Sequence, residues 1–397
     1  MAMIENNSKE TDMKVLFIAG LAEFGGSPNS FMEMVDALAK NYEITPVIMT
    51  GRHGLYYQYA NSHGYEVHVI PYVECMQTLP YKLGRVKAIY KDFKWRHQTK
   101  KLVKLAEEKI NLHEIDLIHT NIERVDLGAA ISEKHKITHV CHIREFGDTD
   151  FNCISIRHNY IKYLNDRTDA FLAISNAVAL HWIKLGLDKN KMEVVYNGVK
   201  NEIAVANKLA SFDSKIHIVM AGTYLENKGQ MQLVNALHLL NEDLLSKISV
   251  DFWGKDIVGY KKELVTRVQQ YDLNEIVCFH NYSTTLSSQL SQYDIGIMAS
   301  KAEGFGRVTV EYMYAGLAVI ASDTGANPEI IDDGVNGLLY HYNDAQSMAS
   351  KLVLLINNAR YRETIAERGK VTVTNRFTPQ INAKNIFDIY KKALHNN

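Results

Sequence analysis

Paired cysteines are absent from this sequence of 397 residues, and so are long apolar runs and a marked excess of either charge. The four cysteines form no C-x-x-C pair and have no histidine partner at zinc-finger spacing, which predicts reduced thiols in a cytosolic protein. No run of 18 apolar residues occurs, so no membrane-spanning helix is expected. The net charge of −1 argues against general attraction to nucleic acid.

The remaining composition is that of a soluble globular protein, with 46% hydrophobic and 22% charged residues. The length is sufficient for two domains of ordinary size. Residues 1–12 are polar and lack the apolar core of a signal peptide, so we expect a disordered tail and a cytoplasmic protein.

Short apolar runs alternate with helical stretches along the chain, and this alternation starts twice. Lys14–Gly20 and His217–Gly222 each read as a buried strand followed by a glycine-containing loop and a helix. The pattern predicts an α/β protein with two Rossmann-like, doubly wound parallel-sheet domains, residues 13–200 and 201–378, facing across a cleft. The last helix, within residues 379–397, either closes the second domain or crosses back onto the first, and both paths stay open.

Two glutamates eight positions apart, Glu303 and Glu311, flank a Gly-Phe-Gly turn. The apolar run Asp294–Ala299 precedes them as a predicted strand, and a helix is expected from about Val308. Ligands of open α/β sheets bind at the carboxyl ends of strands, and a helix N-terminus reached through glycines favours phosphate. Two acids beside a phosphate site suggest hydroxyl-rich groups on both sides, as in a nucleotide sugar. The alternative is a helix whose acid merely complements its dipole.

Two further loops carry phosphate-like features. Gly25-Gly26 follows the first strand and leads into a helix expected from about Phe31, but it is no complete G-x-G-x-x-G fingerprint for NAD. Lys228 precedes Gly229 in the corresponding loop of the second domain and can reach a diphosphate as a point charge. A plain turn and a solvated lysine are the respective alternatives.

His142 ends a predicted strand of the first domain, where an imidazole can position or deprotonate a hydroxyl. A structural histidine is the alternative. Asp148-Thr-Asp150 spells the D-x-D signature of many metal-dependent glycosyltransferases, but three letters occur often by chance. We therefore predict no metal site.

Residues 82–104 contain nine Lys or Arg and one acid, with Tyr90, Phe93 and Trp95 interleaved. A basic helix with aromatic residues suits the surface of an anionic membrane. A solvated helix face is the equal alternative, and RNA binding is less favoured because the rest of the chain is balanced in charge.

Together these motifs resemble the retaining GT-B glycosyltransferases of family 4, from Lys14 to about Tyr390. The resemblance is densest where the glutamate pair is followed by Asp323-Thr-Gly325-Ala-Asn-Pro-Glu329 and Asp333-Gly-Val-Asn-Gly337. It implies a hexosyltransferase that needs no metal or cofactor and moves a sugar from a nucleoside diphosphate donor, with UDP favoured, to a glycan or lipid-linked acceptor. Polysaccharide or glycoconjugate synthesis at the inner face of the plasma membrane would be the setting.

The resemblance also implies roles for individual residues. Glu303 would contact the donor sugar, with Gly304, Phe305 and Gly306 beside it, and Glu311 would hold the ribose. Lys228 would neutralise the diphosphate, and Gly25-Gly26 would meet it from the other domain. His142 would lie near the sugar and the acceptor, with Asn121 and Arg144 as further acceptor-side residues.

One departure from the family pattern concerns the diphosphate. The family usually has an arginine at the position of Thr223, and Arg307 would have to supply the missing charge from another loop. This departure keeps open a catalytically silent partner subunit that binds glycans. A nucleotide-sugar epimerase on the same fold is the other alternative.

Overall fold

The computed structural model describes residues 12–23, 25–78, 85–151, 153–201 and 215–395. Their contacts divide the chain into two compact units. Unit 1 contains the described residues within 1–174, 179–198 and 379–397, and unit 2 contains those within 175–178 and 199–378. The predicted tail falls outside the described residues except for Asp12, whose carboxylate accepts a hydrogen bond from Thr45 Oγ1 at 2.8 Å.

Unit 1 is built on a seven-stranded parallel sheet with the strand order β3-β2-β1-β5-β6-β8-β9. Its strands are β1 (Met13–Ile18), β2 (Ile44–Thr50), β3 (Glu66–Val69), β5 (Leu117–Thr120), β6 (Thr138–Ile143), β8 (Ala170–Ala173) and β9 (Met192–Val194). A separate antiparallel pair joins β4 (Met76–Thr78) to β7 (Cys153–Ser155). The α-helices before residue 200 are α1 (Gly26–Asn41), α2 (Leu55–Ser62), α3 (Arg85–Lys109), α4 (Leu127–His135), α5 (Asp148–Phe151), α6 (Tyr160–Asn165) and α7 (Asn176–Lys184).

Helices cover both faces of this sheet, which explains why the central strands β1 and β2 are largely apolar and buried. In β1, Val15 and Phe17 pack in the core that includes α1, whereas Leu16 and Ile18 pack in the core that includes α3 and α4. Successive side chains of a strand point to opposite faces, so both sets are buried.

Helix α1 begins at Gly26, so the expected start at about Phe31 is wrong by five residues. Pro28 lies in its first turn, where the missing amide proton costs no intrahelical hydrogen bond. The Gly25-Gly26 turn therefore leads directly into the helix.

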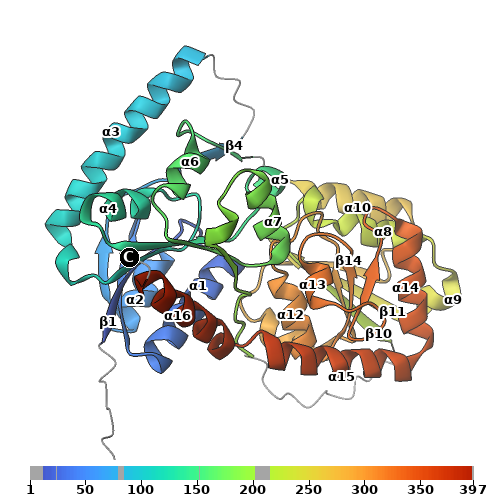
Figure 1. The fold of residues 1–397 in the computed structure, drawn as a ribbon. Helices are drawn as coiled ribbons and strands as arrows, with labels where there is room; N and C mark the ends of the chain where they lie inside the picture. The colour runs from blue at the N-terminus through green and yellow to red at the C-terminus, as the bar shows by residue number, and fades with distance from the viewer. Residues whose placement is uncertain (1–11, 24, 79–84, 152, 202–214, 396–397) are drawn as a thin grey trace, which may run out of the picture. The chain divides into compact units, whose positions relative to one another are not determined.

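The C-terminal helix α16 (Pro379–His395) packs within unit 1. Its buried residues recur at helical spacing and join the core that contains Phe17 and α1; they are Ala383, Ile386, Phe387, Tyr390 and Ala393. The sequence left two paths open for this helix, and the structure places it against α1 (Figure 1).

Unit 2 is built on a six-stranded parallel sheet with the strand order β12-β11-β10-β13-β14-β15. Its strands are β10 (Ile216–Ala221), β11 (Ile248–Gly254), β12 (Val277–Asn281), β13 (Ile295–Met298), β14 (Ala318–Ser322) and β15 (Leu338–Tyr340). Its helices are α8 (Gln230–His238), α9 (Glu242–Ser246), α10 (Tyr260–Gln270), α11 (Leu286–Gln289), α12 (Arg307–Tyr314), α13 (Asn327–Ile330), α14 (Ala345–Asn357) and α15 (Ala359–Arg376). The prediction of two Rossmann-like parallel-sheet domains is confirmed.

Candidate functional site

Lys228 and Glu303 form an ion pair in unit 2, with Nζ and Oε2 3.2 Å apart. Lys228 ends a short turn after β10, and Glu303 lies in the loop after β13, the strand next to β10 in the sheet. Their side chains are 35% and 18% exposed, so both remain partly accessible to a ligand. The two residues that the sequence placed on separate loops thus form one charged pair at one sheet edge.

Close backbone packing brings these two loops together. Gly229, with φ of +78°, lies against the end of β13, and a Cβ at this position would overlap the Ala299 carbonyl. Gly325, with φ of +58°, lies equally close to the backbone of Glu303, whose carbonyl accepts a 2.8 Å hydrogen bond from the Ala326 amide. Glycines at both positions therefore hold the Lys228–Glu303 pair between three loops.

The Gly-Phe-Gly turn caps helix α12 as expected. Gly306 is the residue before the helix and has φ of +90°, a conformation that favours glycine. Phe305 is buried and packs edge-on against Phe377, with ring centroids 5.5 Å apart. The turn is therefore anchored by Phe305, with Gly304 partly exposed before it.

Arg307 and Glu311 lie one turn apart on α12 and form an ion pair of 2.8 Å between Nε and Oε1. The sequence had assigned Arg307 to the charge missing at Thr223, but its guanidinium already neutralises Glu311. Thr223 lies two residues after the end of β10, and its carbonyl accepts a 2.9 Å hydrogen bond from Gln230 Nε2. In this arrangement the Arg307 guanidinium is paired with the Glu311 carboxylate.

His142, Arg144 and Asn121 meet in the interior of unit 1. Arg144 donates from Nε to the Asn121 carbonyl and side-chain oxygen at 2.9 and 2.8 Å, and from Nη1 to Asn197 Oδ1 at 2.8 Å. All four side chains are buried. The Nε2 atom of His142 and the Nδ2 atom of Asn121 have no hydrogen-bond partner among the described residues.

A hydrogen-bonded chain that sequence reasoning missed connects His142 to the C-terminal helix. Tyr390 of α16 bonds to Nδ1 of His119, and Nε2 of His119 lies 3.2 Å from Nδ1 of His142. His119 is the last residue but one of β5, the strand next to β6 in the sheet, and this position beside the strand of His142 was the available signal. Tyr390 lies 271 residues from His119, and nothing local in the sequence pointed to it.

The position of Arg144 determines where the protons lie along the hydrogen-bonded series Tyr390–His119–His142. Burial lowers the pKa of His119 and His142 well below the usual value, and the Arg144 charge adds to this effect, so both rings are neutral. Arg144 Nη2 lies 3.5 Å from His142 Nδ1 and can only donate. Nδ1 of His142 is therefore an acceptor, His119 donates to it, and Tyr390 donates to His119. This assignment leaves a proton on the unpartnered Nε2 of His142.

A buried carboxyl group lies beside this network. Glu123 accepts a 3.0 Å hydrogen bond from the Arg144 amide, while its Oε1 has no partner among the residues described. Burial, with the neighbouring Glu145 charge, raises the pKa of Glu123 to about 8. Glu123 is therefore largely protonated at neutral pH.

The remaining predicted residues of unit 1 have simpler surroundings. Gly25 has φ of +99° and open space at its Cβ position, and both Gly25 and Gly26 are exposed at the start of α1. Asp148 of the D-x-D sequence pairs with His181 at 2.7 Å. Within the described ranges, no cluster of three His, Cys, Asp or Glu has the arrangement of a metal site.

The basic segment forms the long helix α3 from Arg85 onward, and residues 82–84 lie outside the described part of the chain. Its aromatic residues divide into two groups. Trp95 turns into the unit and donates to Asp126 at 3.0 Å, whereas Tyr90 and Phe93 are 65% and 70% exposed. No helix in the described residues has the length and apolar character needed to cross a bilayer.

Comparisons with known proteins identify the family of this chain. The family described as glycosyl transferases group 1 matches residues 202–372, and the family described as glycosyltransferase family 4 matches residues 24–202. A glycosyltransferase of Methanocaldococcus jannaschii without an assigned activity is 30% identical over 276 residues, covering 67% of this chain and 73% of that protein. The capsular polysaccharide biosynthesis glycosyltransferase CapM of Staphylococcus aureus is 23% identical over 64% of each chain.

Among solved structures, HepE of Anabaena in complex with UDP and glucose has a TM-score of 0.76 and 21% identity. The superposition covers 96% of this chain and all of HepE. Both sheets are thus those of the GT-B fold, and the family matches extend over both units. The chain belongs to the group 1 glycosyltransferases.

Proposed function

We propose that this protein transfers a sugar from a UDP-sugar to an acceptor hydroxyl with retained configuration at the anomeric carbon. The reaction creates positive charge on the sugar and negative charge on the departing diphosphate, so the site must stabilise both. The observation that carries the proposal is the Lys228–Glu303 pair, a partly exposed cation and anion at one sheet edge.

Lys228 would stabilise the leaving diphosphate as a point charge. Glu303 holds its ammonium group in place before the donor arrives, and would accept hydrogen bonds from sugar hydroxyls afterwards. Glu311 would accept hydrogen bonds from the ribose, because its pairing with Arg307 favours the charged carboxylate. Because Arg307 pairs with Glu311 and Thr223 replaces the family's usual arginine, Lys228 would be the principal cation for the diphosphate.

His142 would act as a hydrogen-bond donor rather than as a general base. Its Nε2 proton is buried without a partner in the part of the chain that the structure describes, and an unsatisfied buried donor costs about 1–3 kcal/mol. A sugar or acceptor oxygen would satisfy it, and the Nδ2 group of Asn121 is a second unpartnered donor. Arg144 would position both groups without contacting the substrate.

The acceptor would be a glycan or a lipid-linked glycan in cell-surface polysaccharide or glycoconjugate synthesis, as the likeness to CapM supports. Helix α3 would bring the protein to an anionic membrane surface at the cytoplasmic side. Leaving-group stabilisation in this scheme uses protein charges alone, so we propose turnover without an added metal ion.

The test is donor binding and turnover in matched lysine variants. Lys228→Gln should weaken the binding of UDP and UDP-glucose by at least about tenfold, because one hydrogen bond between charged groups is worth about 1.5–3 kcal/mol. Lys301→Gln is the control, since Lys301 is exposed and lies two residues before Glu303. Isothermal titration with each nucleotide measures the difference, and equal affinities in both variants would refute the donor site.

The anomeric configuration of the product, followed by NMR with a panel of glycan acceptors, tests retention. Inversion would refute the retaining mechanism. Binding of the nucleotide sugar without turnover on any acceptor would favour the silent partner that Thr223 keeps open. Conversion of the donor into its epimer without an acceptor would favour the epimerase.

A further inference from the structure

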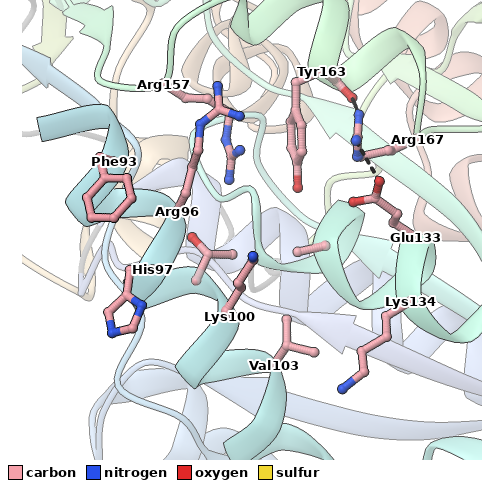
Figure 2. A pocket seen from close by; sticks show the side chains of 12 residues that line it. Phe93, Arg96, His97, Lys100, Val103, Glu133, Lys134, Arg157, Tyr163 and Arg167 are labelled. Carbon is pink, nitrogen blue, oxygen red and sulfur yellow. Dashed lines mark hydrogen bonds and ion pairs between the residues drawn. The ribbon is translucent and has the colours of Figure 1, made fainter. Parts of the chain in front are cut away.

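A cavity of about 850 Å³ lies in unit 1 between α3, α4 and the segment around α6 (Figure 2). It is separate from the His142 network, and neither the family motifs nor the proposed donor site accounts for it. The described residues that line it are rich in cations, namely Arg96, Lys100, Lys134, Arg157 and Arg167, and Glu133 is the single acid among them.

The inner wall of the cavity is a rigid cationic stack. The Tyr163 ring lies between Arg157 and Arg167, whose guanidinium carbons are 3.9 and 4.3 Å from its centroid (Figure 2). Arg157 is held by a buried ion pair of 2.7 Å with Asp126, and Arg167 by an ion pair of 2.6 Å with Glu133. Both guanidinium groups thus have defined positions before any ligand arrives, which lowers the entropic cost of binding an anion.

The outer cations are free to adjust. Arg96 pairs with Asp92, and Lys134 pairs with Glu107, but their side chains are 50% and 56% exposed. Exposed pairs of this kind contribute little energy, so a ligand can replace them easily. Lys100 has no ion pair among the described residues, and its amino group points into the cavity beneath Tyr163 (Figure 2).

The same face of α3 becomes apolar toward the beginning of the helix. Ile89 and Phe93 lie one turn apart and are each 70% exposed. Phe93 also lines the cavity, and Arg96 and Lys100 continue this stripe at helical spacing. One helix face therefore presents apolar side chains next to a cationic cavity.

We propose that the cavity binds the phosphate group of an amphiphile, whose hydrocarbon part lies along Phe93 and Ile89. The cations match a phosphate, and the exposed apolar side chains match a hydrocarbon chain beside it. The site extends the proposed membrane contact of α3 from a diffuse attraction to binding in a defined cavity. It does not depend on the transfer reaction, and its binding can be measured without a donor.

The experiment compares two lysines that are adjacent in sequence. Lys100 lines the cavity, whereas Lys101 is exposed on the same helix outside it. Calorimetric titration of the full chain with octyl phosphate below its micelle concentration should show saturable binding. We expect Lys100→Gln to weaken this binding about tenfold and Lys101→Gln to change it less than twofold, because only Lys100 can contact the phosphate.

Equal losses in the two variants would overturn the proposal, since diffuse attraction depends on charge and not on position. Inorganic phosphate and octyl glucoside separate the two parts of the ligand. Each should bind at least tenfold more weakly than octyl phosphate. If inorganic phosphate binds as tightly as octyl phosphate, the ligand is not an amphiphile. If octyl glucoside binds as tightly as octyl phosphate, the cavity does not recognise the phosphate group.

Vesicles of phosphatidylcholine with one fifth phosphatidylglycerol test the lipid as the source of the phosphate. Co-sedimentation should fall in Lys100→Gln and in Phe93→Ser, and remain in Lys101→Gln. If Lys100→Gln binds these vesicles as the unaltered protein does, the bilayer lipid is refuted as the occupant. Unchanged UDP affinity in the variants would show that unit 2 is intact. A loss of amphiphile binding could then be distinguished from a loss of donor binding.

Discussion

Burial determines which ionisable side chains of unit 1 carry charge. It lowers the pKa of His119, His139 and His142, and that of His139 to about 4. In the unfolded chain these groups protonate near pH 6.5, so the unfolded state binds more protons below that pH. The free energy of unfolding should therefore fall as the pH is lowered below about 6.5.

Glu123 acts in the opposite direction. Its pKa in the folded protein is about 8, above its unfolded value, so the folded state retains a proton that the unfolded state releases. The contribution of Glu123 to the free energy of unfolding therefore decreases as the pH rises from about 4.5 to 8. We predict that Glu123→Gln, which keeps an acceptor for the Arg144 amide, gains stability relative to the unaltered protein across this range.

The slope of this gain should approach about 1.4 kcal/mol per pH unit between pH 5 and 7. Urea denaturation at several pH values measures it, with the exposed Glu108→Gln as the control. A stability difference between Glu123→Gln and the unaltered protein that does not vary with pH would mean that Glu123 is ionised in the folded state.

At the scale of elements, glycines at strand ends allow loops to approach closely enough for their side chains to meet. Gly229 lies between the Lys228 turn and α8, and it contacts the end of β13. A side chain here would suffer both the strain of a positive φ and the overlap with Ala299.

We predict that Gly229→Ala separates Lys228 from Glu303 and weakens UDP binding, with a stability loss of about 1–3 kcal/mol. Gly259→Ala is a matched control, because Gly259 also precedes a helix with a positive φ of 83° but has open space around it. Calorimetry with UDP and urea denaturation measure both effects. Full UDP affinity in Gly229→Ala would show that the close approach does not position Lys228.

Helix α16 supplies the terminal donor of the histidine chain. Tyr390→Phe removes the hydroxyl that donates to His119, so the proton positions on His119 and His142 should no longer be unique. We expect altered imidazole nitrogen shifts in NMR, with a stability loss of about 1 kcal/mol for the hydrogen bond.

Tyr65→Phe is the control for that change, since it removes a hydroxyl bonded to Asp36 in the same unit. Its loss of stability should be similar, but the His119 and His142 signals should stay unchanged. Unaltered signals in Tyr390→Phe would contradict the proton assignment.

At the scale of the whole molecule, the last helix completes a core that begins near residue 13. Phe387 is buried and stacks on Tyr42, with ring centroids 4.6 Å apart. Folding of unit 1 therefore needs residues from both ends of the chain.

We predict that Phe387→Ala lowers the stability of unit 1 by about 3–5 kcal/mol, whereas Lys391→Ala has little effect. Hydrogen exchange followed by mass spectrometry should locate faster exchange in the strands of unit 1. Equal acceleration in the strands of unit 2 would contradict the assignment of α16 to unit 1.

The sequence by itself determined the two parallel sheets, the family, the loops that carry Lys228 and Glu303, and the strand that carries His142. Apolar runs of strand length and glycines after them are local signals, and strand ends of a parallel sheet lie at one edge by topology. The pairing of Arg307 with Glu311 was also readable in principle, because residues four apart share a helix face.

Only the tertiary structure decided the contact of Lys228 with Glu303, the path of α16 and the chain from Tyr390 to His142. These contacts join residues 75 and 271 positions apart, and they depend on how closely loops pack and on which core a helix completes. The surroundings of α3 also depend on the tertiary structure, because its composition was equally compatible with a solvated helix face. Its stripe meets Arg157 and Arg167 only in the folded unit, because packing of α3 against α4 forms the cavity.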